Sequence, residues 1–413
     1  MQSWYSSMAA SQRRTFWGCF LGWVLDAMDV QIFAFVIPTL ITIWGMTKAQ
    51  AGVIGTSALV ASAVGGVAAG LLADRIGRVS VLKISILWFS LFTGLSAFTQ
   101  DFHQLLITRS LQGVGFGGEW AAGAVLIGEV VNKEIRGRAV GSVQSGWPVG
   151  YAMAGLAYWI LYTFLPETTA WRLLFLVGIL PGLLVIWMRR NIKESDAFEA
   201  TSRFRETNGM LGTFKLIFSP GIFRLTALAS MMAAGALGGN YTILTWLVTY
   251  LRQTQSLSVS LTSVFLAVNI FGSFCGYIGM AYMSDGLGRR KTFALSAAGA
   301  TITVLIYTQF HLPLVALLIL GFPLGLFQSG IVSGMGACFT ELFPAHIRGT
   351  AGGFSYNFGR GIGALVPAAV GLTSTSMGLA PSIGIWAASS YILVFIVAIF
   401  LPETRNKELE VHV

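Results

Sequence analysis

Charged residues are scarce in this chain of 413 residues. Asp, Glu, Lys and Arg together make up 10% of it, whereas hydrophobic residues make up 55%, and the mean hydropathy is +0.72. A soluble domain usually holds about 25% charged residues. The low share of charge argues against a soluble enzyme or binding module and favours a protein that lies in a lipid bilayer.

Metal-binding and nucleotide-binding patterns are lacking as well. The four histidines have no metal-ligand spacing, and the three cysteines fall in apolar stretches without the spacing of a disulfide framework. No P-loop occurs, and Gly113-x-Gly115-x-Gly117 lies in an apolar run rather than after a strand, so these glycines indicate close helix packing. We expect no metal, no organic cofactor, no enzymatic activity, and no transport driven by ATP bound to this chain.

Long apolar runs are abundant instead. Each is near 20 residues, about the length that crosses roughly 30 Å of hydrocarbon, and the 49 glycines suit closely packed membrane helices. The first run follows Arg13-Arg14, but Asp26 and Asp29 interrupt it, so it is read as a retained helix rather than a signal peptide. The sequence predicts an all-α membrane protein with twelve transmembrane helices, at about 16–38, 50–72, 80–99, 104–128, 139–164, 172–188, 222–250, 261–283, 292–310, 313–340, 350–372 and 382–401.

The second half of the chain repeats landmarks of the first. The run Gly70–Arg78 is echoed around Asp285, at an offset of 211 (74 to 285), and Glu129 is echoed by Glu341, at an offset of 212. Parallel repeats around a site at the bilayer midplane are the plan of a large class of transporters. We therefore expect an N-terminal six-helix half at 1–188, a cytoplasmic linker at 189–220 and a C-terminal six-helix half at 221–413.

The net charge of +9 is distributed as in a membrane protein rather than as a nucleic-acid surface. With the first residues assigned to the cytoplasm, 21 of the 26 Lys and Arg residues fall on cytoplasmic segments and three on external loops. This asymmetry satisfies the positive-inside rule, and the basic residues are scattered over short loops. We expect the cytoplasmic (inner) membrane, both termini in the cytoplasm, and no nucleic-acid partner.

Two runs of residues resemble motifs of the major facilitator superfamily. Gly70–Arg78 is similar to its signature loop, and Arg109–Gly115 resembles its motif in the fourth helix. The resemblance covers the whole chain and implies the major facilitator fold, with a central cavity and alternating access. More narrowly, three further runs resemble bacterial proton symporters of organic anions, of the sialic acid and aromatic acid branches: Asp26–Asp29, Gly117–Trp120 and Tyr356–Arg360.

Charges on the cytoplasmic loops are the expected gating residues. The aspartate of the signature loop suits a helix N-terminus, and the resemblance implies that it braces the two halves. Two expected pairs, Glu129 with Arg136 and Glu341 with Arg348, would break as the cavity opens inward. Surface ion pairs are individually weak, so the gating role is collective. The full set is Asp74, Arg75, Arg78, Glu129, Arg136, Asp285, Arg289, Glu341 and Arg348.

Five charges fall inside the expected helices, where each costs about 2.5–3.5 kcal/mol or more and so indicates function. At about 1.5 Å per residue, Asp29 and Arg109 come to similar depths and are expected to pair. Movement of the arginine would promote proton uptake by the carboxylate. Asp26, one turn away, is an alternative proton carrier. Glu119 is either a second protonatable site or a partner for a basic group. For Asp29 and Arg109, the alternative to a proton switch is a static pair that ties their two helices together.

Arg360, the fifth of these charges, lies near the midplane, about 15 Å up its helix. Its planar fork matches a carboxylate, so it is the main expected substrate contact, unless it serves only to neutralise Asp26 or Glu119. The resembling fold places polar residues of four helices around the cavity. The other expected substrate contacts are Asn357, Tyr356, Asn240, Tyr241 and Gln328.

The function predicted is proton-coupled symport, inward, of a small organic anion such as a carboxylate or an acidic sugar, by a functional monomer in the bilayer. The proton is the coupling ion. A symporter of neutral sugars or polyols is the first alternative, and Arg360 counts against it. A drug or metabolite exporter is the second, and the two acids at residues 26 and 29 make it less consistent with the sequence.

Overall fold

The structure is a computed structural model that describes residues 5, 8–130, 142–180, 182–183, 185, 187, 216–343 and 348–404. The regular elements in these ranges are all helices. The first half contains α1 (Ala10–Trp44), α2 (Lys48–Ile76), α3 (Arg78–Ser96), α4 (Phe102–Val130), α6 (Gly146–Phe164) and α7 (Glu167–Val177). The second half contains α11 (Pro220–Thr249), the π-helix η1 (Tyr250–Thr254), α12 (Val259–Leu287), α13 (Arg289–Gln309), α14 (Leu314–Leu342), α15 (Arg348–Gly363), α16 (Leu365–Met377) and α17 (Leu379–Phe400).

The predicted all-α fold class is confirmed, and each of the twelve expected stretches contains helix. Eight helices in the described ranges are long and apolar enough by themselves to cross a membrane. The eleventh stretch was expected to be one helix, but it divides at Ala364 into α15 and α16. Pro367 has no N–H for the carbonyl of Gly363, four residues back, and this accounts for the break. Most of the expected linker at 189–220 lies outside the described residues.

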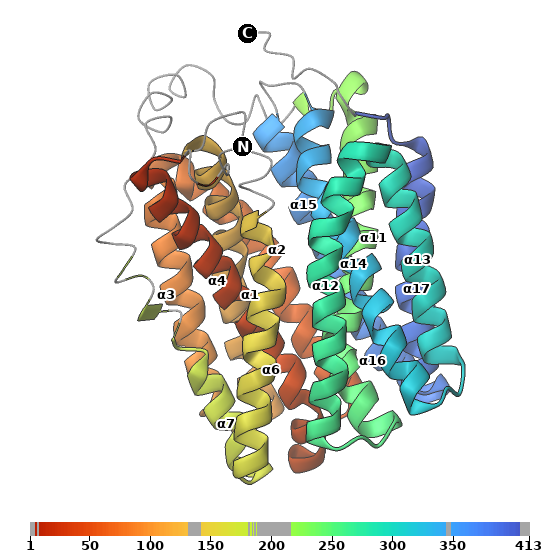
Figure 1. Cartoon of the computed structure of the whole chain (residues 1–413). Helices are drawn as coiled ribbons and strands as arrows, with labels where there is room; N and C mark the ends of the chain where they lie inside the picture. Colours follow the sequence, from red (N-terminus) through yellow and green to blue (C-terminus); the bar gives the residue numbers. More distant parts are fainter. Residues whose placement is uncertain are drawn as a thin grey trace.

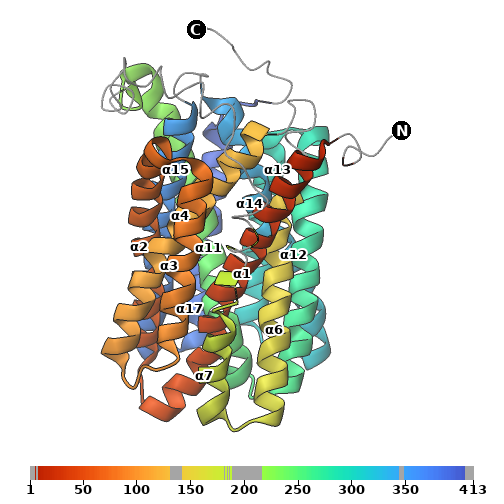
Figure 2. The ribbon, with the colours of Figure 1, turned by 90° about the vertical axis from the view of Figure 1, so that its left-hand side faces the viewer.

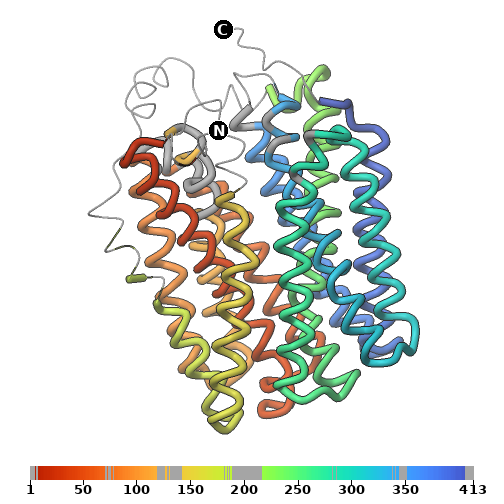
Figure 3. Tube along the Cα trace, viewed as in Figure 1, coloured from red at the N-terminus to blue at the C-terminus, as the bar shows by residue number. Residues whose placement is uncertain are grey.

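The helices form two groups, which follow each other along the chain (Figure 1). In the first group α4 packs on α2 and α3, and α1 packs on α6. In the second, α14 packs on α12, α17 packs on α13, and α15 packs on α11. The helices run up and down within each group (Figure 3), and α1 crosses its group obliquely (Figure 2). The start of α1 and the end of α17 both lie at the end drawn uppermost in Figure 1, which we call the upper end.

Close helix approach at glycines fixes the packing inside each group. A Cβ added at Gly117 of α4 would lie 1.8 Å from the carbonyl oxygen of Ser62 in α2, and one at Gly113 would lie 2.0 Å from that of Ala58. The second group uses the same device, because a Cβ at Gly325 of α14 would lie 2.0 Å from the carbonyl oxygen of Asn269 in α12. The glycine pattern at 113–117 therefore serves helix packing, as predicted from the sequence.

Replacement of Gly117 by alanine should destabilise the protein, because the added methyl group meets backbone that cannot rotate away. Overpacking of this kind costs about 1–3 kcal/mol, and the midpoint of thermal unfolding in detergent should fall. Gly279→Ala in α12 is the matched control, since a Cβ there meets nothing within 4 Å. Equal stability of both variants and the wild type would contradict this account of α2–α4 packing.

The two groups meet through α2 with α15 and α16, through α6 with α12, and through α1 with α11. Near the end drawn lowermost in Figure 1, the lower end, the approach is close. A Cβ at Gly52 of α2 would lie 2.9 Å from the carbonyl oxygen of Pro367, and the Thr56 hydroxyl accepts a hydrogen bond of 3.1 Å from the backbone N–H of Ala368. Pro367, which interrupts the eleventh helix, therefore lies at the contact between the halves.

Candidate functional site

Asp29 of α1 is bound on both oxygens by neighbouring helices. Its Oδ1 accepts a hydrogen bond from the hydroxyl of Thr93 in α3, and its Oδ2 accepts one from the amide of Gln112 in α4. Arg109 of α4 completes the group, with Nη1 3.7 Å from Oδ2, and both charged side chains are almost fully buried. The structure thus brings together the two residues whose depths predicted a pair. The role of the pair in proton coupling stays a prediction.

Arg109 is held mainly by rings and by its counter-ion. Its guanidinium carbon lies 5.3 Å from the ring centre of Phe33 and 5.9 Å from that of Phe175. Its Nε and Nη1 form no hydrogen bond with any described residue. A cation over aromatic faces is stabilised by the ring quadrupole, and the Nε and Nη1 donors of Arg109 stay available to a water molecule.

Arg360 of α15 lies between the two groups of helices and is only 1% exposed. Its guanidinium carbon is 5.2 Å from the ring centre of Phe116 in α4 and 4.9 Å from that of Tyr356, one turn back in α15. Nη2 donates a hydrogen bond of 3.4 Å to the Tyr356 hydroxyl, and the side chain of Tyr241 in α11 also interacts with the guanidinium. Nε and Nη1 have no hydrogen-bond partner among the described residues.

The two acids of α1 face different cations although they are one turn apart. Asp29 contacts Arg109, whereas Asp26 attracts Arg360 electrostatically across the boundary between the halves. Asp26 is fully buried, at 0% exposure. One of the two internal partners considered for Arg360 is therefore present. A charged substrate at Arg360 would interact with the field of Asp26, so the two acids are not equivalent.

A small cavity of about 30 Å³ lies beside these groups, between α1, α2, α4 and α11. This volume has room for a few water molecules. Phe116 and Tyr241 belong to its wall and also contact Arg360, so these two rings lie between the cavity and the arginine. The lining is Val30, Gln31, Phe33, Ala34, Gly55, Ala58, Leu59, Arg109, Gln112, Phe116, Tyr241, Leu244 and Thr245.

The other expected substrate residues have different surroundings. The Asn357 amide donates 3.1 Å to the carbonyl of Gly353 in its own helix, and its Oδ1 lies close to Gly66 of α2. Asn240 and Gln328 are buried but do not line the cavity. Of the six expected contacts, Tyr241 is in the lining, Arg360 and Tyr356 lie behind it, and these three amides lie elsewhere. Their roles stay predictions.

A polar cluster joins the two halves at the lower end. Arg252 of η1 donates 2.9 Å to the hydroxyl of Tyr158 in α6 and 2.9 Å to the carboxylate of Glu167 in α7. The other carboxylate oxygen of Glu167 accepts 3.1 Å from Thr39 in α1. Together with the α2–α16 contact, this cluster links the two halves at the lower end. Arg252 is one of the three basic residues that the sequence places on external loops, and no role was predicted for it.

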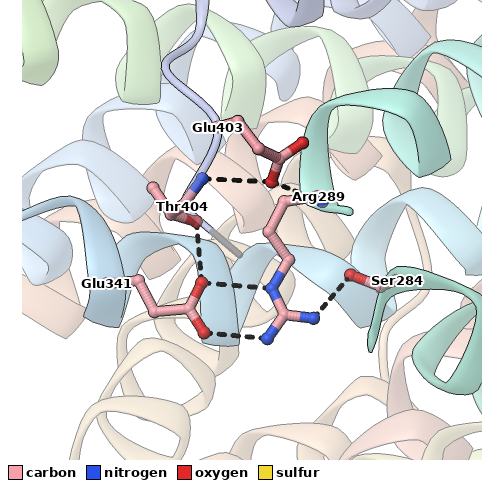
Figure 4. A network of polar contacts seen from close by, with 5 residues as sticks. All are labelled: Ser284, Arg289, Glu341, Glu403 and Thr404. Carbon is pink, nitrogen blue, oxygen red and sulfur yellow. Dashed lines mark hydrogen bonds and ion pairs between the residues drawn. The ribbon is translucent and has the colours of Figure 1, made fainter. Parts of the chain in front are cut away.

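A second polar network lies at the upper end, and the five residues labelled in Figure 4 all belong to the second half. Arg289, at the start of α13, forms two bonds with Glu341 near the end of α14, of 2.8 and 3.1 Å. Glu403, which follows α17, accepts the backbone N–H groups of Arg289 and Arg290 at 2.9 and 3.3 Å. A carboxylate at a helix N-terminus is favourable. Gly288, with φ 99°, precedes the helix. Because glycine has no Cβ, it leaves space for the carboxylate of Glu403.

This network changes the interpretation of the gating residues. Glu341 was expected to pair with Arg348, but Arg289 binds it; the Arg348 side chain lies outside the described residues. Because Arg289 and Glu341 belong to the same half, their pair does not have to break when the halves move. The other expected gating side chains also lie outside the description: Asp74, Arg75, Arg78, Glu129, Arg136 and Asp285, as does that of Glu119.

The Arg289→Lys variant should lower thermal stability by about 1–2 kcal/mol, because lysine cannot form the paired bonds to Glu341 or the 3.0 Å bond to Ser284. Thermal unfolding in detergent measures this. Arg290→Lys is the matched control, since the exposed Arg290 takes part through its backbone N–H. If both variants unfold at the wild-type temperature, the network contributes nothing to holding the second half together.

The sequence analysis missed several residues of these sites. Glu403 was assigned no role, because its partner lies 114 residues away along the chain. Phe33 and Phe116 were not distinguished from other apolar residues. Gln31 carried a usable signal, since a polar side chain in the middle of an apolar run requires an explanation just as a charge does.

Two helical halves with buried charges between them define a membrane transporter. Family models agree: the model of the Major Facilitator Superfamily matches residues 19–282, and that of the Sugar (and other) transporter family matches 206–412. The chain belongs to the major facilitator superfamily.

Relatives extend over the whole chain. A probable 4-methylmuconolactone transporter of Cupriavidus pinatubonensis is 42% identical, over 99% of this chain and 95% of its own length. A cis,cis-muconate transport protein of Acinetobacter baylyi is 31% identical, over 94% of this chain and 93% of its own. The crystal structure of a D-xylose–proton symporter has the same fold, with a TM-score of 0.74 at 19% identity, over 96% of this chain and 99% of that one. All three are transporters rather than enzymes.

Proposed function

We propose that the protein imports a small organic anion, such as a carboxylate, together with protons, by alternating access. The observation that supports the anion is Arg360. Its guanidinium is buried between the halves and keeps Nε and Nη1 without a hydrogen-bond partner in the described part of the chain. Unsatisfied buried donors are costly, and a carboxylate would satisfy two of them in one plane.

The names of the relatives agree with this cargo. One is described as a probable transporter of 4-methylmuconolactone and another as a cis,cis-muconate transport protein. Muconate is a dicarboxylate with an apolar, unsaturated body, whereas the muconolactone has a lactone in place of one carboxylate. The rings of Phe116 and Tyr241 and the side chain of Leu244 would suit such a body in this chain.

Coupling to protons is assigned to Asp29 and Arg109. While Arg109 lies 3.7 Å from the carboxylate, it favours the charged form of Asp29. A shift of α4 relative to α1 that separates the pair would leave a buried carboxylate without its cation, which then takes a proton. Asp26 and Glu119 are the alternative carriers. The cycle needs no cofactor besides the proton, and a single chain contains the whole cavity, so a monomer suffices.

The upper end is assigned to the cytoplasm of a bacterial-type inner membrane. The start of α1 and the end of α17 lie at that end, whereas Lys48, Arg172 and Arg252 belong to elements at the lower end. Closure of the lower end by Arg252 and Glu167 then shuts the external path. The cavity of about 30 Å³ is too small for an organic acid, so the halves have to move apart to admit one.

The test is uptake into proteoliposomes with an imposed pH gradient, after a thermal-shift screen of carboxylates, sugar acids and neutral sugars. Binding of carboxylates, uptake that rises as the external pH falls, and loss of accumulation with a protonophore are expected. A neutral sugar is the second candidate, because the Sugar (and other) transporter model matches the second half. Stabilisation by neutral sugars alone would favour it, and accumulation that ignores the pH gradient would contradict proton symport.

A further inference from the structure

Gln31 of α1 is a buried amide without a hydrogen-bond partner. Its side chain is 1% exposed, and neither Oε1 nor Nε2 forms a hydrogen bond with a described residue. Buried polar groups are nearly always paired in native structures, so each exception requires an explanation. The helix gives no local reason for a glutamine at this position, because a leucine would fill the same space.

The surroundings of Gln31 point to a ligand. Its side chain lines the same small cavity as Phe116 and Tyr241, the two residues that also contact Arg360. The hydroxyl of Tyr151 in α6 interacts with the amide of Gln31 without reaching hydrogen-bond geometry, and it has no other hydrogen-bond partner among the described residues. An amide and a hydroxyl together can donate to, and accept from, a group that enters the cavity.

The charges in the cavity wall decide which polar group of a cargo can lie next to Gln31. Among the described residues of the cavity wall, Arg109 is the single charged one. Its positive charge is already balanced by the carboxylate of Asp29 at 3.7 Å. A second carboxylate next to Gln31 would be buried without a free cation, which is unfavourable. A hydroxyl, a lactone or a carbonyl oxygen requires only hydrogen bonds, and those Gln31 can supply.

We propose that Gln31 forms a second subsite of the cavity and binds an uncharged, hydrogen-bonding group of the cargo, while Arg360 binds its carboxylate. The cargo is then a monocarboxylate with an apolar body and one neutral polar group at its far end. This inference rests on the proposed function and makes it narrower. Gln31 then determines specificity, and its amide forms hydrogen bonds with the cargo during transport.

Three probes that differ only at the far end test the subsite: benzoate, 4-hydroxybenzoate and terephthalate. In the purified wild type, the dissociation constant of 4-hydroxybenzoate should be at least about tenfold lower than that of either other probe, since a site built for a hydroxyl disfavours analogues without it. Gln31→Leu should remove this preference and leave the affinity for benzoate unchanged. Its thermal stability should not fall, because the replaced amide has no partner to lose.

Gln309→Leu is the matched control, because it makes the same change at an exposed position of α13, outside the wall of the cavity. It should keep the wild-type preference. Equal weakening of all three probes in Gln31→Leu, or binding of terephthalate as tight as that of 4-hydroxybenzoate in the wild type, would overturn the subsite. Absence of binding by all three probes and by the wider carboxylate screen would instead contradict the proposed function, and the subsite with it.

Discussion

Arg360→Lys is expected to weaken binding of an anionic cargo about 100-fold and to reduce uptake accordingly. Lysine keeps the positive charge, and hence the attraction to Asp26, but it loses the planar pair of donors that matches a carboxylate. A hydrogen bond to a charged group contributes about 1.5–3 kcal/mol, and each 1.4 kcal/mol corresponds to a factor of ten. Affinity and uptake have to be measured together, on equal amounts of membrane-inserted protein.

The matched control for this variant is Arg224→Lys, which makes the same change at an exposed position of α11. It should bind and transport like the wild type. Thermal unfolding should be close to normal in both variants, because the ring contacts of Arg360 with Phe116 and Tyr356 suit either cation. Wild-type affinity in Arg360→Lys would remove this residue from the substrate site.

The pairing of Asp29 with Arg109 could be predicted because both lie in regular helices. A rise of about 1.5 Å per residue converts sequence position into depth, and opposite charges at equal depth in a bilayer have a strong reason to meet. Depth alone cannot give the rotation of a helix about its axis. For that reason the sequence could not separate Asp26 from Asp29, whereas the structure assigns them to different cations.

Helix depth could not predict contacts between segments that lie far apart in the sequence. The partners of Arg289 and Glu403 depend on how α13, α14 and the segment after α17 end relative to one another, and this is decided by packing rather than by a periodic pattern. The break at Ala364 is different from these contacts, because a proline inside a helix indicates a break and Pro367 is visible in the sequence. Twelve apolar stretches were easier to recognise than one interruption within them.

Gln31 illustrates a narrower limit. The sequence singled out charges first, since a charge in a membrane helix is the costliest exception, and it pointed to the amides of Asn240, Gln328 and Asn357 but not to Gln31. An amide costs less to bury, so it stands out only when the structure reveals that its hydrogen bonds are missing. Polar residues within apolar runs therefore have to be weighed with the charges when a transporter sequence is interpreted.

Asp29→Asn is expected to abolish accumulation driven by a pH gradient while exchange of cargo across the membrane continues. Asparagine has the shape of a protonated aspartate, and its carbonyl oxygen can still accept a hydrogen bond from Thr93 or Gln112. It cannot release a proton, so the return of the empty carrier no longer depends on the gradient. Counterflow needs no net proton release, and it should persist in proteoliposomes loaded with cargo.

Asp26→Asn is the matched comparison, one turn away in the same helix. Because Asp26 attracts Arg360, its neutralisation should change the affinity for an anion and favour tighter binding, since the internal competitor is gone. Accumulation should still follow the pH gradient, because Asp29 can still bind and release a proton. The reverse result, with coupling lost in Asp26→Asn and kept in Asp29→Asn, would move the carrier to Asp26. Normal proton-driven accumulation in both variants would contradict a carrier in α1 and direct attention to Glu119 of α4.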